Sequence, residues 1–326
     1  MADSFEGRTW GSLRVKGTKF LCRALPPIIS QRLRQVLCPH EIAQSQKIEF
    51  SMKSWTGSRL SGNTDDYHLC RFYFHGYFEW RNLAIAQAVC SKGDTIVEIG
   101  ANVGTETFSY ADIVGSKGHV FAFEPVPANV LQLKKSLAAN PGIPVTLFPI
   151  ALAAQRGNLA FILPRDHRES GLGRLASHMD EGEGDTIDVE VALLNDFAQQ
   201  IQRARLIMMD VEGHELSVLR GAHDYLEKYH PVIVLEADDR WIARAGGTPQ
   251  ELFNELAGLS YRIYRISRMG LAPLQIDGPV ASDCGHSANW LALPRHDENL
   301  APKIASHLIR GAITPLGLGL NPLERV

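Results

Sequence analysis

Two acidic residues on either side of a glycine-containing turn have types and spacing that suit a nucleoside ligand. Glu98 stands just before Gly100-Ala101-Asn102-Val103-Gly104, and Glu124 follows 24 positions after Gly100. Glycines let a strand turn tightly into a helix and let a ligand approach the backbone. A carboxylate about 20 residues beyond such a turn commonly accepts hydrogen bonds from ribose hydroxyls. The pattern favours a nucleoside site; a purely structural turn and an acid favoured by the helix dipole are the alternatives.

The spacing within the turn indicates which nucleoside would bind. A dinucleotide-binding turn requires Gly-x-Gly-x-x-Gly to seat a pyrophosphate against a helix, and Asn102 occupies the place of its middle glycine. An acid at Glu98 would repel a pyrophosphate but suits an ammonium group. S-adenosylmethionine joins a ribose to a positively charged amino-acid end, so we expect it as the cofactor.

A third polar motif, Asp210-Val211-Glu212-Gly213-His214-Glu215, is expected at the end of a later strand, beside the methyl donor. Asp210 or His214 would remove a proton from an acceptor hydroxyl, and Glu212 would orient the acceptor. A histidine at a helix amino end stays neutral because the helix dipole is positive there. The alternatives are that Glu212 and Glu215 only favour a helix amino end and that His214 is a surface residue.

Further acids follow the next predicted strand. Glu236, Asp238 and Asp239, together with Asp210, could hold a divalent cation through carboxylate oxygens. Charge-balanced surface acids are the more frequent explanation, so we expect no metal. Upstream, the aromatic-rich stretch from Tyr67 to Trp80 is explained mainly by core packing.

Short apolar runs and amphipathic segments must position these residues. Helices are expected over Val103–Val114, Pro127–Ala138 and Glu215–Tyr229. Their alternation with buried strands predicts an α/β fold with an open, mostly parallel sheet that binds ligands at the carboxyl ends of its strands. The polar stretch between Ile150 and Leu206 is either a solvated surface insertion or a mobile loop that covers the ligand. The expected strands are Thr95–Ile99, Val120–Phe123, Val145–Ile150, Leu206–Met209 and Val232–Leu235.

The ordered set of motifs resembles the FkbM family of S-adenosylmethionine-dependent methyltransferases over about residues 70–295. The resemblance implies the class I methyltransferase fold, a Rossmann-like sheet of seven mostly parallel strands with helices on both faces and an antiparallel last strand. It also implies that the segment Gly76–Glu79, with Tyr77, forms a wall of the donor site and that Ala101, Pro125 and Ala151 lie near the donor. Two positions depart from the family pattern, with Glu98 in place of the usual Asp and Asn195 in place of a frequent Asp. The similar segments are Glu98–Gly104, Phe123–Pro125, Gly171–Gly173, Asp210–Glu215, Leu219–Ala222, His230–Glu236 and Asn289–Ala292.

Composition and charge limit the organisation and the partners. The 326 residues are 45% hydrophobic and 21% charged, as in an ordinary globular chain, and the net charge of −3 argues against nucleic acid as the main partner. We expect a partly helical N-terminal extension over residues 1–92 that contributes to the donor and acceptor site. A methyltransferase domain over residues 93–295 and a C-terminal tail over residues 296–326 would follow.

Five scattered cysteines, no apparent secretory signal and no membrane-length apolar stretch predict a cytoplasmic protein without stable membrane insertion. The weakly patterned first 60 residues could mediate self-association into a homo-oligomer. The predicted function is O-methylation, by in-line methyl transfer, of a hydroxyl on a small-molecule or glycan acceptor: a sugar, a glycolipid or a natural product. A catalytically silent S-adenosylmethionine-binding protein and an NAD-dependent oxidoreductase are the alternatives.

Overall fold

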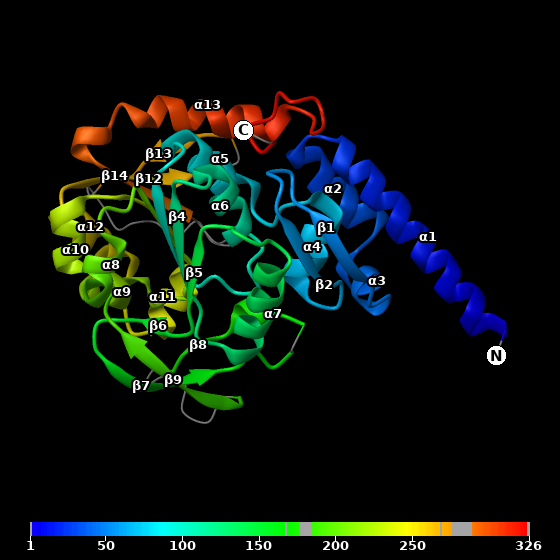
Figure 1. Cartoon of the computed structure of the whole chain (residues 1–326), viewed down its shortest axis with the longest axis horizontal. Coiled ribbons are helices and arrows are strands. Elements are labelled where there is room, and N and C mark those ends of the chain that lie inside the picture. Colours follow the sequence, from blue (N-terminus) through cyan, green and yellow to red (C-terminus); the bar gives the residue numbers. More distant parts are fainter. Residues whose placement is uncertain (1, 167, 177–183, 268, 276–288, 325–326) are drawn as a thin grey trace.

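The computed structural model describes residues 2–324 except 167, 177–183, 268 and 276–288 (Figure 1). Its centre is an eight-stranded sheet in the order β13-β12-β14-β11-β10-β3-β4-β5. The neighbours from β11 to β5 are parallel, and β14 is antiparallel to both β11 and β12. The strands are β3 (Thr95–Ile99), β4 (His119–Phe123), β5 (Val145–Phe148), β10 (Leu206–Met209), β11 (Val232–Glu236), β12 (Tyr261–Ile266), β13 (Leu271–Pro273) and β14 (Asn289–Pro294).

This strand order confirms the class I methyltransferase fold. The expected count of seven strands was one too low, because the short β13 pairs with the outer edge of β12. Helices cover both faces, and alternate strand residues supply the two cores: Ile96 packs on one side and Val97 on the other. The helices are α5 (Trp80–Val89), α6 (Thr107–Val114) and α13 (Leu300–Ile313) on the first side, α9 (Glu215–Gly221), α10 (His223–Tyr229) and α12 (Pro249–Gly258) on the second, and α7 (Pro127–Ala138), α8 (Ala198–Ile201) and α11 (Asp239–Arg244) around them.

Three expected elements differ from the observed ones by more than one residue. The helix expected over Val103–Val114 begins only at Thr107, because Asn102 and Gly104 have positive φ values of 49° and 84° that a helix cannot contain. The helix expected over Glu215–Tyr229 is two helices, with a break at Ala222. The strand expected over Val145–Ile150 ends at Phe148.

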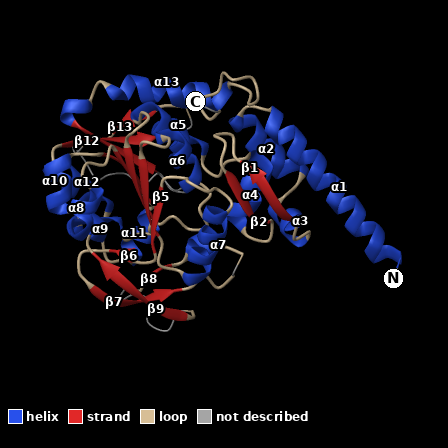
Figure 2. Ribbon diagram, in the orientation of Figure 1, coloured by secondary structure: helices blue, strands red, loops and turns tan. Residues whose placement is uncertain are grey.

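The long insertion is neither a plain loop nor a plain surface segment. It forms a second, four-stranded sheet in the order β6-β9-β7-β8, drawn below the central sheet in Figure 2. A small separate core packs against this sheet and includes Val126, Ala151, Phe161 and Val189. Its elements are β6 (Ala151–Leu152), β7 (Gly157–Ile162), the 3-10 turn η1 (Ser170–Leu172), β8 (Arg174–Leu175) and β9 (Thr186–Ala192).

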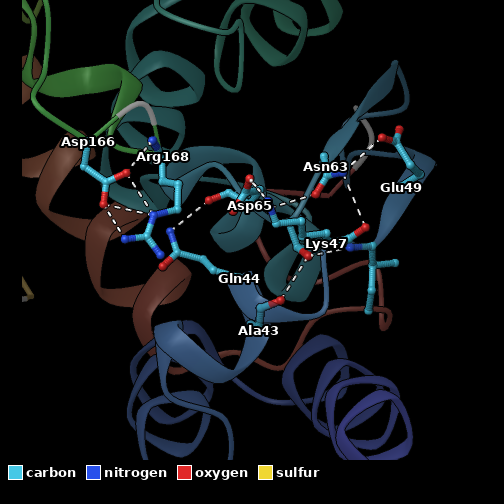
Figure 3. A network of polar contacts seen from close by, with 10 residues as sticks. Ala43, Gln44, Lys47, Glu49, Asn63, Asp65, Asp166 and Arg168 are labelled. Atoms are coloured by element: carbon cyan, nitrogen blue, oxygen red, sulfur yellow. Dashed lines mark hydrogen bonds and ion pairs between the residues drawn. The ribbon is translucent and has the colours of Figure 1, made fainter. Parts of the chain in front are cut away.

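The N-terminal segment forms a helical layer with a two-stranded hairpin. A network of polar contacts holds its connections: Lys47 pairs with Asp65 at 3.2 Å, and the Gln44 side chain donates to the Asp65 carbonyl at 3.0 Å (Figure 3). The Tyr67 amide donates to the Arg168 carbonyl at 2.7 Å, which joins this layer to the insertion. Its elements are α1 (Ala2–Ala24), α2 (Pro27–Leu37), α3 (His40–Ser45), β1 (Glu49–Lys53), β2 (Arg59–Asn63) and α4 (Tyr67–His75).

In the part of the chain that the structure describes, no helix combines the length and apolar character needed to cross a bilayer. Cys22, Cys38, Cys70 and Cys90 are free thiols. α5 from the expected extension packs on the central sheet, and α13 from the expected tail packs on α5.

Candidate active site

A cavity opens at the carboxyl ends of β3, β4, β10 and β11, where the fold class binds its ligands. It is lined by both polar and apolar side chains, as small-molecule sites usually are. Gly104 and Tyr77, predicted near the donor, do not line it. The predicted site residues that do line it are Glu98, Gly100, Ala101, Asn102, Glu124, Pro125, Ala151, Asp210, Glu212 and His214.

The glycine turn after β3 is held by the two neighbouring strands. The amides of Gly100 and Ala101 both donate to the Phe123 carbonyl at 3.0 Å. Gly100 has φ 87°, and a Cβ there would lie 1.9 Å from the carbonyl oxygen of Asp210. The turn therefore requires glycine at this position for both its conformation and its contact with the end of β10.

Glu124 is the acceptor that organises the turn. One oxygen accepts the Asn102 amide at 2.8 Å; the other accepts the Val126 amide at 2.8 Å and the Asn129 side chain at 3.3 Å. Burial raises the pKa of Glu124 to about 7, although these hydrogen bonds favour its charged form. A carboxylate has about four lone-pair sites, so one remains for a ligand hydroxyl.

Glu98 lies at the inner end of the cavity with a buried acid that the sequence reasoning missed, Glu106. One oxygen of each carboxyl group is buried without a hydrogen-bond partner among the described residues. The other oxygen of Glu106 accepts from Asn82 at 3.3 Å and from Tyr110 at 3.2 Å. Burial raises the pKa of Glu106 to about 8 and that of Glu98 well above its ordinary value. Two buried acids with open oxygens suit a ligand ammonium group, and the position of Glu106 two residues after Gly104 was the available signal.

Three carboxylates meet at the ends of β10 and β11. Oxygens of Asp210, Glu212 and Glu236 all lie within 4.8 Å of one another. Burial, followed by mutual repulsion for Glu212 and Glu236, raises the pKa of each. Asp238 is not part of this group, because Arg240 pairs with its carboxylate at 2.7 Å and lowers its pKa. Of the cation ligands considered from the sequence, Asp210 and Glu236 therefore remain in the cluster, and Glu212 joins them.

His214 links the site to the insertion. It precedes the first residue of α9, and its Nε2 lies 2.9 Å from the carbonyl oxygen of Leu175 on β8. A carbonyl only accepts, so Nε2 carries a hydrogen and donates it to this contact. Since Leu175 itself lines the cavity, His214 helps to hold this part of the insertion over the site.

The N-terminal layer supplies an aromatic wall that contains Phe78, from the segment Gly76–Glu79 that the family resemblance indicates, and His68. His68 and Phe78 line the cavity, and their rings stack at 4.0 Å with 15° between their planes. Tyr77 is fully buried instead, with its ring 5.5 Å from that of His75. The two neighbouring side chains point to opposite sides of the short irregular segment after α4.

Comparison with known proteins identifies the family. The model of the methyltransferase FkbM domain matches residues 98–263. The chain belongs to the FkbM methyltransferase family. It is a methyltransferase that uses S-adenosylmethionine.

Relatives of this family member include a curated protein and solved structures. Hexuronic acid methyltransferase AglP of Haloferax volcanii is 28% identical over 183 residues, which cover 54% of this chain and 68% of AglP. The O-methyltransferase TomG of Streptomyces achromogenes, solved with S-adenosylmethionine, has 13% identity and a TM-score of 0.40 over 66% of this chain and 78% of TomG. A methyltransferase FkbM of Methylobacillus flagellatus has 16% identity and a TM-score of 0.37 over 85% of this chain and 58% of its own.

Proposed function

We propose that this family member binds S-adenosylmethionine across the glycine turn and methylates a hydroxyl of a sugar, a glycolipid or a natural product. The observation that supports the proposal is the pair of buried acids, Glu98 and Glu124, on either side of a turn that lines the cavity. Glu124 would accept a ribose hydroxyl through its remaining lone pair. Glu98 and Glu106 would bind the ammonium group.

The bound donor supplies an electrophilic methyl group on a sulfonium. The protein's task is then to align an acceptor oxygen, which in favourable cases lowers a barrier by about 7–11 kcal/mol. The carboxylates of Asp210, Glu212 and Glu236 provide negative charge beside the expected sulfonium position, which stabilises a cation in a partly enclosed site.

We assign the general base to Asp210. Its side chain is exposed to the cavity, and its raised pKa brings the carboxylate closer to the pH at which a base works best. Glu212 would orient the acceptor hydroxyl. His214, the other candidate, is assigned a positioning role because its Nε2 is bonded to the Leu175 carbonyl.

The charge of the site favours a neutral acceptor group. The acidic cluster would repel an acceptor carboxylate even where protons balance part of its charge, whereas a hydroxyl can donate its proton to Asp210. The name of AglP, which describes a methyltransferase of a hexuronic acid, supports a sugar as the acceptor class. We therefore propose a sugar hydroxyl, free or on a lipid carrier.

The test combines donor binding with turnover. Calorimetry should detect binding of S-adenosylmethionine and of its demethylated product, whereas NAD should neither bind nor raise the melting temperature. Isotopically labelled donor should then transfer label to a member of a sugar and glycolipid panel. Failure to bind either nucleoside by well-folded protein would overturn the proposal. Tight binding without transfer to any acceptor would favour the catalytically silent alternative.

A further inference from the structure

Exposed apolar side chains are concentrated on one group of neighbouring elements. Nine of the twelve large apolar side chains that are exposed among the described residues lie on α1, α2, α13 and the segment after α13. Contiguous exposed apolar surface marks an interaction site more often than scattered single residues do. The nine are Leu13, Phe20, Leu21, Ile29, Val36, Ile309, Ile313, Leu318 and Leu320.

α1 carries apolar side chains on its outer face as well as on the inner face that packs on the protein. Val15 and Cys22 are buried on its inner face, while Leu13 and Phe20 stand seven residues apart on the outer face, 63% and 76% exposed. Residues seven apart lie on one stripe of a helix, and at 100° per residue Arg14 and Lys16 flank that stripe on its two sides. Figure 1 shows α1 extending away from the rest of the molecule.

α2 repeats this arrangement beside α1. Ile29 and Val36 are again seven residues apart, 52% and 74% exposed, and the exposed Arg32 lies close to their stripe. Ser30 and Arg34 are buried on the opposite side. The two helices are joined by hydrogen bonds, including one from the Ser30 hydroxyl to the Cys22 carbonyl at 2.8 Å.

The charged side chains of these segments are almost all basic. Between Glu6 and Glu41 the sequence has seven Lys and Arg residues and no acid, although the whole chain carries −3, and three of the seven, Arg14, Lys16 and Arg32, are exposed in the structure. The segment from Asn299 to Leu323 likewise has Lys303 and Arg310 and no acid. A second copy of the chain would place basic side chains against basic side chains, which is unfavourable. An anionic lipid surface complements both the charge and the apolar stripes.

We propose that the outer faces of α1, α2 and α13 dock on the surface of an anionic lipid bilayer. The apolar side chains would enter the boundary between headgroups and acyl chains, and the flanking basic residues would contact lipid phosphates. The helices would lie in the plane of the interface rather than cross it.

The position of this surface relative to the cavity also indicates which class of acceptor the enzyme would methylate. This inference about the acceptor rests on the proposed function. α1 packs on α4, where the Lys19 ammonium lies 3.9 Å from the ring centre of Tyr73, and α4 in turn presents His68 to the cavity. The docking face and the cavity therefore lie on two sides of one layer of helices. A glycolipid held in the bilayer is the acceptor class that this arrangement suits, since its sugar would project from the surface on which the enzyme sits.

Vesicle flotation of the full chain tests the docking. Vesicles of phosphatidylcholine alone are compared with vesicles in which about one third is phosphatidylglycerol, at low and at high salt. We expect binding to the anionic vesicles that weakens at high salt and is much weaker on the neutral ones. The triple variant R14E/K16E/R32E should reduce partitioning roughly 100-fold, because each basic residue near the surface contributes about fivefold. The triple variant L13S/F20S/V36S should also release the protein.

A matched control is available on α7, where Leu131, Lys134 and Lys135 are exposed. The variant L131S/K134E/K135E removes comparable groups and should float like the wild type. Each variant must keep its melting temperature and its affinity for S-adenosylhomocysteine. If the wild type does not bind the nucleoside, this result contradicts the proposed function, but the conclusion from vesicle flotation still holds.

The proposal is overturned if the wild type floats with neither vesicle, or if the α7 control loses binding as much as the two test variants. Light scattering is run in parallel. A dimer that the L13S/F20S/V36S variant dissociates, without any vesicle binding, would assign the face to a second copy of the chain.

Discussion

The carboxylate of Glu124 accepts a hydrogen bond from the main-chain amide of Asn102 at 2.8 Å, across 22 residues of sequence. The contact joins the end of β4 to the turn after β3 and holds Asn102 in its left-handed conformation, with φ 49°. Glu124 thus shapes the backbone of the cavity, and its remaining lone pair faces the place expected for a ribose. The binding role that we propose for Glu124 therefore depends on the same carboxylate that shapes the local structure.

Replacement of Glu124 by Gln tests this double role. The new amide would put an N–H group against either the Asn102 or the Val126 amide, so one hydrogen bond to a charged acceptor is lost and a donor is left unpaired. Such losses cost about 1.5–3 kcal/mol, which predicts a roughly 10–100-fold weaker affinity for S-adenosylhomocysteine by calorimetry. Glu49→Gln on the exposed strand β1 is the control and should bind normally. An unchanged affinity for Glu124→Gln would contradict the assignment.

A second prediction separates backbone strain from steric conflict. Gly93 and Gly100 have similar φ values of 96° and 87°, but a Cβ at Gly93 meets nothing within 4 Å, whereas one at Gly100 meets the Asp210 carbonyl oxygen at 1.9 Å. Gly93→Ala should lower the free energy of unfolding by about 1 kcal/mol. Gly100→Ala should cost at least about twice as much and abolish nucleoside binding. Chemical denaturation measures both free energies of unfolding. Equal losses for the two variants would show that the structure accommodates the added Cβ at position 100 without further cost.

A third prediction distinguishes the base from the positioning residue. Asp210→Asn should lower kcat by roughly 10²–10⁴-fold while leaving donor affinity within a few-fold of the wild type. His214→Gln keeps a side-chain N–H that can donate to the Leu175 carbonyl, and we expect it to retain most activity, whereas His214→Ala should lose more. If His214→Gln is as inactive as Asp210→Asn, the histidine is the base and the assignment must be exchanged.

The sequence predicts the central sheet well because buried parallel strands have a strong local signature. The observed bounds of β3, β10 and α7 are the predicted ones, since continuous apolar runs mark the strands and Pro127 marks the first turn of α7. The second sheet has no comparable signature. Its β7 pairs with β9 across a long polar stretch, so its register depends on tertiary packing that the local pattern does not contain.

The same distinction applies to the site. Motif residues at the strand ends, such as Glu98 and Asp210, could be predicted because the sheet topology fixes where they meet. His68 could not, since an otherwise separate layer of helices brings it to the cavity, and Phe78 is indicated only by the family resemblance. The sequence does not single out Glu106, because the expected helix begins at Val103 and therefore places Glu106 inside regular structure.

A fourth prediction concerns metal. The cluster of Asp210, Glu212 and Glu236 could hold a cation through its oxygens, but we propose that protons and the donor sulfonium balance its charge. Extensive dialysis against EDTA should therefore leave kcat within about twofold of its starting value. The control adds magnesium, manganese or calcium to the dialysed enzyme. A loss of activity on chelation that one of these ions restores would contradict the proposal and assign a metal to the cluster.

The fifth prediction follows from the buried acids that surround the expected donor. Burial raises the pKa of Glu124 to about 7 and that of Glu106 to about 8, and raises those of Glu98, Glu212 and Glu236. A carboxyl group whose pKa is higher in the folded than in the unfolded state stabilises the fold at low pH, and this stabilisation is lost as the pH rises through the folded value.

The melting temperature of the ligand-free protein should therefore fall as the pH rises from the ordinary glutamate pKa of 4.5 to about 8, and the contributions of Glu124 and Glu106 should level off above that pH. The positively charged donor favours the ionised acids, so its affinity should rise over the same range with release of protons. Calorimetry in two buffers of different ionisation enthalpy measures that release. S-adenosylhomocysteine, which has the ammonium group but not the sulfonium, is the matched ligand and should show a shallower dependence. Equal slopes for the two ligands would mean that the acids at the ends of β10 and β11 do not face the sulfonium.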